Sequence, residues 1–325
     1  MNVITALRRP AAVAVLAAAT LLPLAACSTT EDTSATEIPT PPAATTPAAE
    51  STALPTIEPT DEPADVRLDE RFEDLESAYD ARLGVYVLDT GSGQDITYRA
   101  DERFAYASTF KILLCAVVLD QHSFDDLEEL ITFSADDLQA HSPITSERVE
   151  TGMTIRELCD AATRYGDNTA VNLLLDVLGG PSGLGEALKA AGDDVISVDR
   201  YAPELSEATP GDTRDTSTPR ALATTLRLFA LEDALPEDKR ELLTEWMVGN
   251  LTGEDLIRAG IPDDWTVGDR TGAAHYGTRN CIAIVWPPDR DPILIALLTS
   301  RDTEDAERQD ELIVEATEAI VDALT

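Results

Sequence analysis

Residues 108–119 read Ser108-Thr109-Phe110-Lys111-Ile112-Leu113-Leu114-Cys115-Ala116-Val117-Val118-Leu119. The apolar run predicts a buried helix, and Lys111 is the only charged side chain within it. A lysine in such a run costs free energy unless it is paired or functional. The chain has only three lysines, at 111, 189 and 239, and uses arginine for its other cations. Because a desolvated lysine can lose its proton and an arginine cannot, Lys111 is a candidate general base.

Ser108 lies three residues before Lys111, so the two side chains share one face of the predicted helix. Ser108 also stands at the helix N-terminus, where free backbone N–H groups and the helix dipole favour a developing oxyanion. A serine beside a lysine base is a known alternative to the histidine-based triad. The other interpretation makes Ser108 a helix cap and lets Lys111 reach solvent along the helix surface.

Helix and strand patterns at both ends of the domain enclose a helical middle. Helical periodicity covers 68–83, 110–119, 154–165, 169–178, 218–231, 236–248 and 304–324, and strand patterns cover 84–88, 96–98, 265–270, 281–286 and 293–299. We therefore expect an α+β fold, with an antiparallel sheet flanked by N- and C-terminal helices and an inserted all-helical lobe. The predicted domain is 66–325; its sheet lobe comprises 66–103 and 250–325, and its helical lobe 104–249.

The start of the chain is predicted to lie outside this domain. Two arginines precede an apolar run, 11–22, that is too short to span a bilayer comfortably. Small residues then lead to Cys27, as in the lipobox of bacterial lipoproteins, so 1–27 is interpreted as a lipoprotein signal peptide with Cys27 lipidated. An ordinary signal peptide with an incidental cysteine is the alternative. Residues 28–65, rich in Thr, Pro and Ala, predict a disordered linker. The expected location is the outer face of the bacterial cytoplasmic membrane.

The net charge and the number of cysteines limit the kinds of partner and the cysteine pairings that the chain can have. The 325 residues carry a formal net charge of −37, which leaves no basic footprint for nucleic acid. We expect a monomer that meets small molecules and, through Cys27, the membrane. Three further cysteines remain, Cys115, Cys159 and Cys281. Because three is odd, at least one thiol stays free or pairs between chains.

Two more motifs follow the serine and lysine. Gly166-Asp167-Asn168 joins two predicted helices, and Arg270-Thr271-Gly272 ends a predicted strand. With Ser-x-x-Lys, they resemble the three-part signature of class A β-lactamases and penicillin-binding proteins. The resemblance to class A serine β-lactamases runs from about residue 68 to the C-terminus and includes the stretches 141–145, 156–159, 167–175 and 200–219.

The resemblance implies a role for each matching residue. Ser108 would attack the lactam carbonyl and Lys111 would take its proton. The backbone N–H groups of Ser108 and Ala273 would form the oxyanion hole, worth roughly 3–4 kcal/mol per donor. The implied substrate-binding residues are Asn168 for the side-chain amide and, around the antibiotic's carboxylate, Arg270, Thr271, Gly272, Ala273 and Arg279. No metal or cofactor is implied.

The same resemblance implies two structural pairs. Cys115 and Cys159 match a disulfide found in many members of the family. Arg200 and Asp215 match the ion pair that closes its omega loop, the segment that carries the water-activating carboxylate.

Three positions depart from the family pattern. Gly166 stands where the family has a serine that relays a proton to the leaving lactam nitrogen. Ala202 stands where it has the glutamate that activates the hydrolytic water, and Ser206 replaces an asparagine that helps to position that water. Loss of a general base costs about 10²–10⁴ in rate. Arg270 in place of lysine keeps the charge and is a milder departure.

We therefore expect a serine β-lactamase-type enzyme that is acylated on Ser108 and deacylates slowly. One alternative is a β-lactamase with some hydrolytic activity, in which Glu204 activates the water or the water attacks without a general base. A second is a non-hydrolytic β-lactam binder, and a third a D,D-peptidase or transpeptidase, which the omega-loop match disfavours. The last is a partner-binding protein on a retired enzyme fold.

Overall fold

The structure, a computed structural model, describes residues 64–325. The signal peptide predicted for 1–27, lipidation of Cys27 and nearly all of the linker predicted for 28–65 lie outside these residues. The first helix, α1 (Ala64–Tyr79), includes the last two residues of that predicted linker. Within residues 64–325, no helix has both the length and the apolar character needed to cross a membrane.

Five antiparallel strands form the central sheet in the order β2-β1-β9-β8-β7. They are β1 (Arg82–Asp89), β2 (Asp95–Tyr98), β7 (Thr266–Ala273), β8 (Arg279–Trp286) and β9 (Ile293–Ser300). Alternate residues of β8 and β9 enter two different cores, because successive side chains of a strand point to opposite faces. The sheet is therefore covered on both faces.

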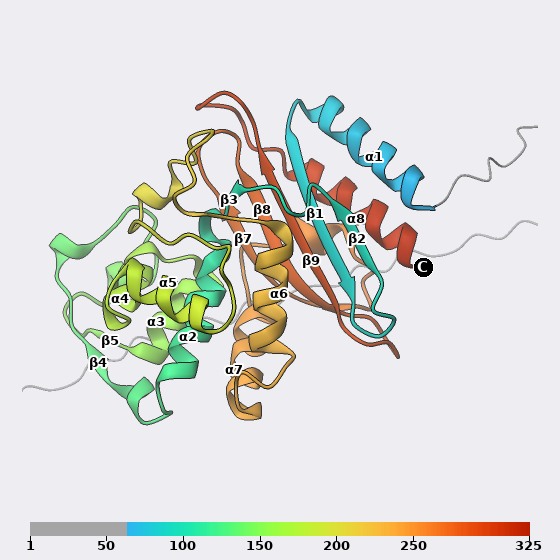
Figure 1. The fold of residues 1–325 in the computed structure, drawn as a ribbon. Helices are drawn as coiled ribbons and strands as arrows, with labels where there is room; N and C mark the ends of the chain where they lie inside the picture. Colours follow the sequence, from blue (N-terminus) through green and yellow to red (C-terminus); the bar gives the residue numbers. More distant parts are fainter. Residues whose placement is uncertain (1–63) are drawn as a thin grey trace, which may run out of the picture. The chain divides into compact units, whose positions relative to one another are not determined.

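Different helices cover the two faces of the sheet. Helix α1 and the C-terminal α8 (Asp310–Leu324) pack together on one face, where Phe72 and Ile313 are fully buried (Figure 1). Helix α6 (Pro219–Ala230) lies against the other face, toward the helical part of the domain (Figure 1). The N- and C-terminal pieces thus share one sheet, as the sequence predicts, and the α+β fold class is confirmed.

The helical part surrounds α2 (Lys111–Gln121), whose residues 111–119 are all buried. Its neighbours are α3 (Ile155–Asp160), α4 (Asn168–Val177), α5 (Pro181–Ala190) and α7 (Glu237–Val248). Two small antiparallel pairs complete the domain, β3 (Phe104–Ala105) with β6 (Thr216–Ser217) and β4 (Leu130–Ile131) with β5 (Met153–Thr154). Because residues 111–119 are buried on every side of the helix, all of them except Lys111 are apolar.

Two predicted helix boundaries were wrong. The first helix was expected to reach Leu83, but it ends at Tyr79, and Asp80 has a φ of 47°, which turns the chain into β1. The last helix was expected from Glu304 and begins at Asp310. The intervening segment is held in another conformation, because Arg301 N donates to Tyr276 O and Tyr276 N donates to Glu304 O.

The disulfide predicted between Cys115 and Cys159 is not formed in the structure, which holds both as buried free thiols. The two residues are nevertheless in contact, since Cys115 Sγ donates to Cys159 O at 3.7 Å. Burial and the neighbouring Cys115 thiol raise the pKa of Cys159 well above its usual value. The sequence was right about the proximity of the pair, and the bond itself stays a prediction.

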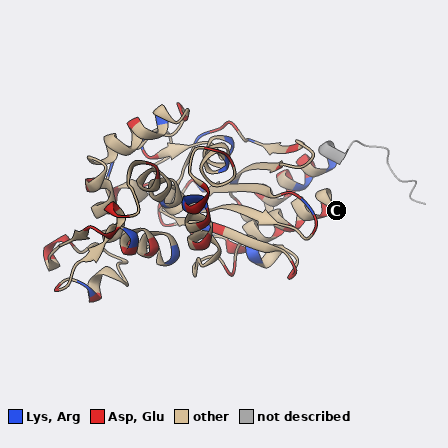
Figure 2. Cartoon of the chain, turned by 90° about the horizontal axis from the view of Figure 1, so that it is seen from below, with Lys and Arg blue, Asp and Glu red and all other residues tan. Residues whose placement is uncertain are grey.

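Acidic side chains are spread over the described chain. Figure 2 shows Asp and Glu on helices and loops of both the helical part and the sheet. Within residues 64–325, no group of His, Cys, Asp and Glu side chains is arranged to hold a metal ion.

Candidate active site

Ser108 lies in a short 3₁₀ turn, Ala107–Phe110, that leads directly into α2. The preceding Ala107 has a φ of 51°, a left-handed conformation that costs an alanine free energy. Strand β7 passes close to this turn at Gly272. A Cβ atom at Gly272 would lie 3.0 Å from Tyr106 O and 3.1 Å from Ser108 N, so only glycine lets the strand come this near. Gly272 therefore positions the strand and does not itself line the site.

Lys111 begins α2 and is 1% exposed. Its Nζ donates to Gly166 O and to Asn168 Oδ1, both at 2.7 Å. Burial, and then the nearby charge of Arg270, hold the pKa of Lys111 well below its usual value. A neutral amine has two N–H groups and one lone pair, so these two acceptors satisfy both donors and leave the lone pair for a proton.

No hydrogen bond joins Lys111 Nζ to Ser108 Oγ within residues 64–325. Catalytic hydrogen bonds are often long before substrate binds, so this does not remove Lys111 as the base. The interpretation of Ser108 as a helix cap is not supported, because the turn and α2 have no side-chain cap.

Asp167 fixes the loop that carries Gly166 and Asn168. Its fully buried carboxylate accepts from the backbone N–H groups of Ile144, Thr145 and Ala170. The hydroxyl of Thr145 donates to the same carboxylate. Asp167 thereby caps α4 and ties residues 141–145 to it, which places the two acceptors of Lys111 on rigid backbone.

A cavity of about 460 Å³ opens beside Ser108. The predicted residues in its lining are Ser108, Gly166, Asn168, Ser206, Arg270, Thr271, Ala273 and Arg279. The other lining residues are His141, Thr252 and Arg308, which the sequence did not single out as site residues. Lys111, Gly272 and Ala202 are buried behind this lining.

Arg270 is the buried cation of the cavity, with 2% of its surface exposed. Its Nη1 donates to Thr252 Oγ1 at 2.9 Å, while Nε has no hydrogen-bond partner among the described residues. No carboxylate in that part of the chain forms an ion pair with it. Burial lowers the pKa of Arg270 to about 10, so the group remains a cation at neutral pH. A buried cation without a counter-charge favours an anionic ligand.

A hydroxyl chain orders this cation. Thr252 donates its one proton to Asn250 Oδ1 at 2.8 Å, so its oxygen must accept from both Arg270 and Thr271. Asn250 in turn donates to the buried carboxylate of Asp269 at 3.0 Å. The chain holds Arg270 at a fixed place along β7.

Arg279 lines the cavity but is held by a partner of its own. Its Nε and Nη2 contact the two carboxylate oxygens of Asp310 at 2.6 and 3.2 Å. The sequence did not predict this ion pair, which leaves Arg270 and the exposed Arg308 as the cavity's cations with no carboxylate partner within residues 64–325.

Ala202 is held by its backbone. Asn172 accepts from Ala202 N at 2.9 Å and donates to Ala202 O at 2.8 Å, so one side chain on α4 pins both polar groups of the residue. The Ala202 side chain brings no carboxylate toward Lys111. Glu204 lies two residues on, exposed at the start of the turn Glu204–Ser206, and does not line the cavity.

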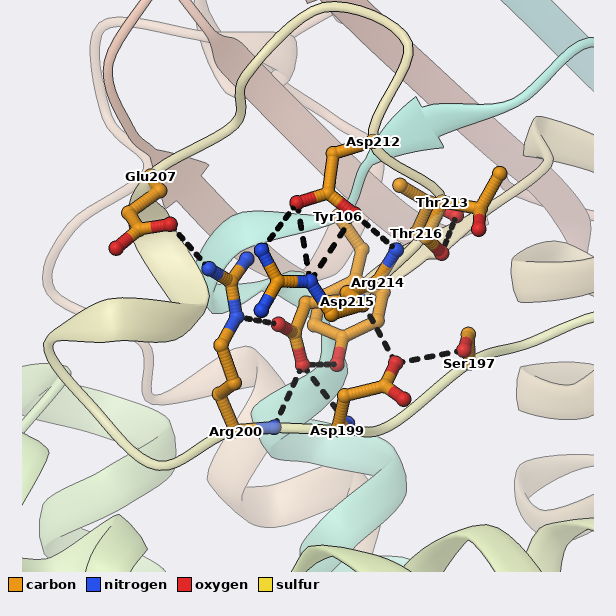
Figure 3. Close-up of polar contacts among 10 residues, drawn as sticks. All are labelled: Tyr106, Ser197, Asp199, Arg200, Glu207, Asp212, Thr213, Arg214, Asp215 and Thr216. Atoms are coloured by element: carbon orange, nitrogen blue, oxygen red, sulfur yellow. Dashed lines mark hydrogen bonds and ion pairs between the residues drawn. The ribbon is translucent and has the colours of Figure 1, made fainter.

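Figure 3 shows how the segment that carries Ala202 is closed. Arg200 Nε lies 2.5 Å from Asp215 Oδ2, and Arg200 also contacts Glu207. The other oxygen of Asp215 accepts from the backbone N–H groups of Asp199 and Arg200 and from the phenol of Tyr106. The ion pair implied by the sequence is present, and Tyr106 connects it to the chain just before Ser108.

Fold and contacts together define a class. A serine at the entry of a buried helix, beside a buried lysine with a lowered pKa and a buried arginine without a carboxylate partner, is typical of serine acyl-transfer enzymes that use no histidine.

Known proteins place the chain within that class. Residues 67–324 match the model of the β-lactamase enzyme family. The chain is 55% identical over 266 residues to a β-lactamase of Amycolatopsis lactamdurans, covering 82% of this chain and 88% of that one. It is 52% identical over 267 residues to a β-lactamase of Bacillus licheniformis, covering 82% and 87% of the two chains. The chain therefore belongs to the β-lactamase enzyme family.

Solved structures give the class. The class A β-lactamase of Clostridium kluyveri is 47% identical, with a TM-score of 0.79 over 80% of this chain and 99% of that one. A halotolerant bacterial β-lactamase is 54% identical, with a TM-score of 0.77 over 78% and 98% of the two chains. These matches identify a class A serine β-lactamase.

Proposed function

We propose that the protein opens β-lactam rings by acylation of Ser108 and releases the acyl group slowly. One observation carries the proposal. The amine of Lys111 is buried and hydrogen-bonded to two neutral oxygens, while the residue aligned with the family's water-activating glutamate is Ala202. The groups for the first half-reaction are present, and the general base of the second is missing.

Acylation needs only residues that the site contains. Ser108 Oγ forms a bond to the lactam carbonyl carbon as its proton passes to the lone pair of Lys111. The C–N bond of the ring then breaks, and the nitrogen takes up the proton that Lys111 received, which a water can carry across the site, so that the lysine is neutral again. Because burial lowers the pKa of Lys111, the amine loses its proton at a lower pH than an exposed lysine does, without a carboxylate to deprotonate it.

Deacylation needs a water activated next to the ester. Ala202 cannot accept a proton, and the exposed Glu204 does not reach into the cavity. The water would have to attack without a carboxylate as its proton acceptor, using Lys111, His141 or bulk solvent instead. Loss of a general base costs about 10²–10⁴ in rate, so the acyl-enzyme is expected to accumulate.

A mass-spectrometric time course tests the proposal. The domain 66–325 is mixed with a penicillin, and both protein and antibiotic are followed. Ring opening has no leaving group, so the adduct should carry the full mass of the antibiotic, and Ser108→Ala should abolish it. A long-lived adduct supports the proposal. Rapid hydrolysis without an adduct contradicts slow deacylation.

The alternatives predict other results in the same experiment. A partner-binding protein would give neither adduct nor hydrolysis. An acyl-D-Ala-D-Ala peptide is therefore tested beside the penicillin. A D,D-peptidase would release the terminal D-alanine from it. A non-hydrolytic binder would form an adduct that does not decay over days. The measured decay rate of the adduct therefore separates such a binder from a slow enzyme.

We further propose that the mature chain is anchored through a lipid on Cys27 at the outer face of the cytoplasmic membrane. The support is the apolar run 11–22 followed by small residues and the cysteine. In a bacterial host, the full chain should pellet with membranes and incorporate labelled palmitate, whereas Cys27→Ser should do neither. Palmitate-free membrane association of the parent chain would contradict the anchor.

A further inference from the structure

The guanidinium of Arg270 lies where a side chain of residue 166 would begin. A Cβ atom at Gly166 would lie 2.9 Å from Arg270 Nη2 and 3.4 Å from His141 Nε2. Any side chain at 166 would therefore begin inside the contact distance of the guanidinium. In the β-lactamase pattern, position 166 carries a serine and position 270 a lysine, so the two departures fall on two groups that touch.

The guanidinium has little freedom to move away. Arg270 is 2% exposed, and Thr252 holds its Nη1 at 2.9 Å. Thr252 is itself bonded to Asn250 and Thr271. For a side chain buried along its length and fixed at one nitrogen, moving away from a new Cβ would strain the hydrogen bond to Thr252 and the surrounding packing.

The outer nitrogen Nη2 lies beside Gly166, 2.9 Å from where a Cβ of that residue would be. No hydrogen-bond partner for Nη2 is present among residues 64–325, and Arg270 and Gly166 both line the cavity beside Ser108. Nη2 thus presents a donor at the place from which a side chain of residue 166 would act. A lysine at 270 would lack a second terminal nitrogen that could donate here, because its ammonium is a single point of charge.

We infer that Arg270 acts on the substrate directly and takes over the place of the missing side chain at 166. Nη2 donates a hydrogen bond to the ring-nitrogen side of the β-lactam while the same guanidinium holds the substrate's carboxylate. Arg270 keeps its proton throughout and serves only as a donor. Gly166 and Arg270 therefore form one unit, in which neither residue can be exchanged alone. This inference rests on the acylation of Ser108 proposed above.

A double-mutant cycle tests the unit with Gly166→Ser, Arg270→Lys and the double variant. Gly166 has a φ of 74°, so serine there is strained in either background, and this strain cancels in the cycle. Gly166→Ala separates the Cβ from the hydroxyl. Arg71→Lys, on an exposed helix, is the matched control for arginine-to-lysine exchange and should change nothing.

The first readout is the acylation of Ser108, with the limiting rate separated from the affinity of the initial complex. Arg270→Lys should lower the limiting rate about 10- to 100-fold, the value of one charge-assisted hydrogen bond. Gly166→Ser and Gly166→Ala should also lower it while Arg270 is present. The double variant should recover most of the loss. Fold-changes that simply multiply overturn the inference, as does an effect on affinity alone.

The second readout is the midpoint of thermal unfolding, which needs no substrate. Gly166→Ser should lower the midpoint more in the parent chain than in the Arg270→Lys background. Equal shifts would show that the two residues do not compete for space and overturn the inference. If the parent chain is never acylated, the proposed function fails, and this second cycle still decides whether the two positions are coupled.

Discussion

Tyr106 Oη donates to Asp215 Oδ1 at 3.2 Å, although 109 residues separate the two along the chain. Asp215 is the buried anchor of the segment that carries Ala202, and Tyr106 immediately precedes the turn of Ser108. Burial, and then the carboxylate of Asp215, raise the pKa of Tyr106 well above its usual value. The phenol therefore remains a donor over the whole working pH range, and it couples the nucleophile turn to the loop behind it.

Tyr106→Phe should lower the free energy of unfolding by about 1–1.5 kcal/mol, the net value of one hydrogen bond. Asp215→Asn should cost more, on the order of 3 kcal/mol, because it removes the buried charge partner of Arg200 and leaves only the half-exposed Glu207. Urea denaturation followed by circular dichroism measures both. The exposed pair Arg214–Asp212 is the control, and Arg214→Ala should leave the midpoint unchanged. A loss for Tyr106→Phe as large as that for Asp215→Asn would contradict this assignment.

Acylation should lose its base in Lys111→Arg. Arginine keeps the charge but cannot be deprotonated, so the rate should fall by about 10²–10⁴. Stopped-flow measurement with a chromogenic β-lactam gives the rate. Lys189→Arg, on the surface of α5, is the matched control and should behave as the parent chain. An unchanged rate in Lys111→Arg would assign the proton to another group.

The same rate should depend on pH with a rising acid limb. Acylation needs neutral Lys111, so the rate increases as pH rises through the pKa of the lysine and is constant above it. Because burial lowers that pKa, the midpoint should lie well below 10.5. A limb centred near the ordinary value for lysine would show that the amine is charged in the resting site.

Ala202→Glu should restore the second half-reaction. Decay of the adduct is expected to accelerate by about 10²–10⁴, the contribution of a general base. The new carboxylate should also stabilise the charged form of Lys111, which raises its pKa and moves the acid limb of acylation to higher pH. Faster decay without this shift would place the carboxylate away from Lys111. Glu204→Gln is the control and should leave the decay rate unchanged, because Glu204 is exposed outside the cavity.

Oxidation should join Cys115 and Cys159. The domain purified from an oxidising compartment should show one reactive thiol after denaturation, that of Cys281, and three after reduction. Closing a loop of 44 residues should add about 4 kcal/mol to the free energy of unfolding in the chain-entropy model. Cys281→Ser should leave this difference intact. Three thiols in the oxidised protein would exclude the bond.

The sequence predicts best what is local. Ser108 and Lys111 are three residues apart on one helical face, so the pair appears from spacing alone, whereas the capping role of Asp167 became apparent only in the structure. Helix α5 was missed because Gly183 and Gly185 weaken a helical pattern, each by about 1 kcal/mol relative to alanine. In the fold, Gly183 is required, since a Cβ there would meet Leu178 O at 1.9 Å.

The missed site residues are those that only the fold brings near. Thr252 holds Arg270 from a loop with no motif of its own, and Asn172 pins Ala202 from another helix. Asp310 neutralises Arg279 from the start of the last helix. Each contact joins segments far apart in the chain, and neither periodicity nor residue type shows which distant partner a polar side chain will find.

The contact between Gly166 and Arg270 gives the history of this site a direction. A lineage with serine and lysine at these positions can lose the serine first, which opens the volume that a guanidinium then fills. The opposite order passes through a chain in which a Cβ and Nη2 lie 2.9 Å apart. Once arginine is in place, a returning serine must displace the guanidinium, so the pair disfavours simple reversion at 166.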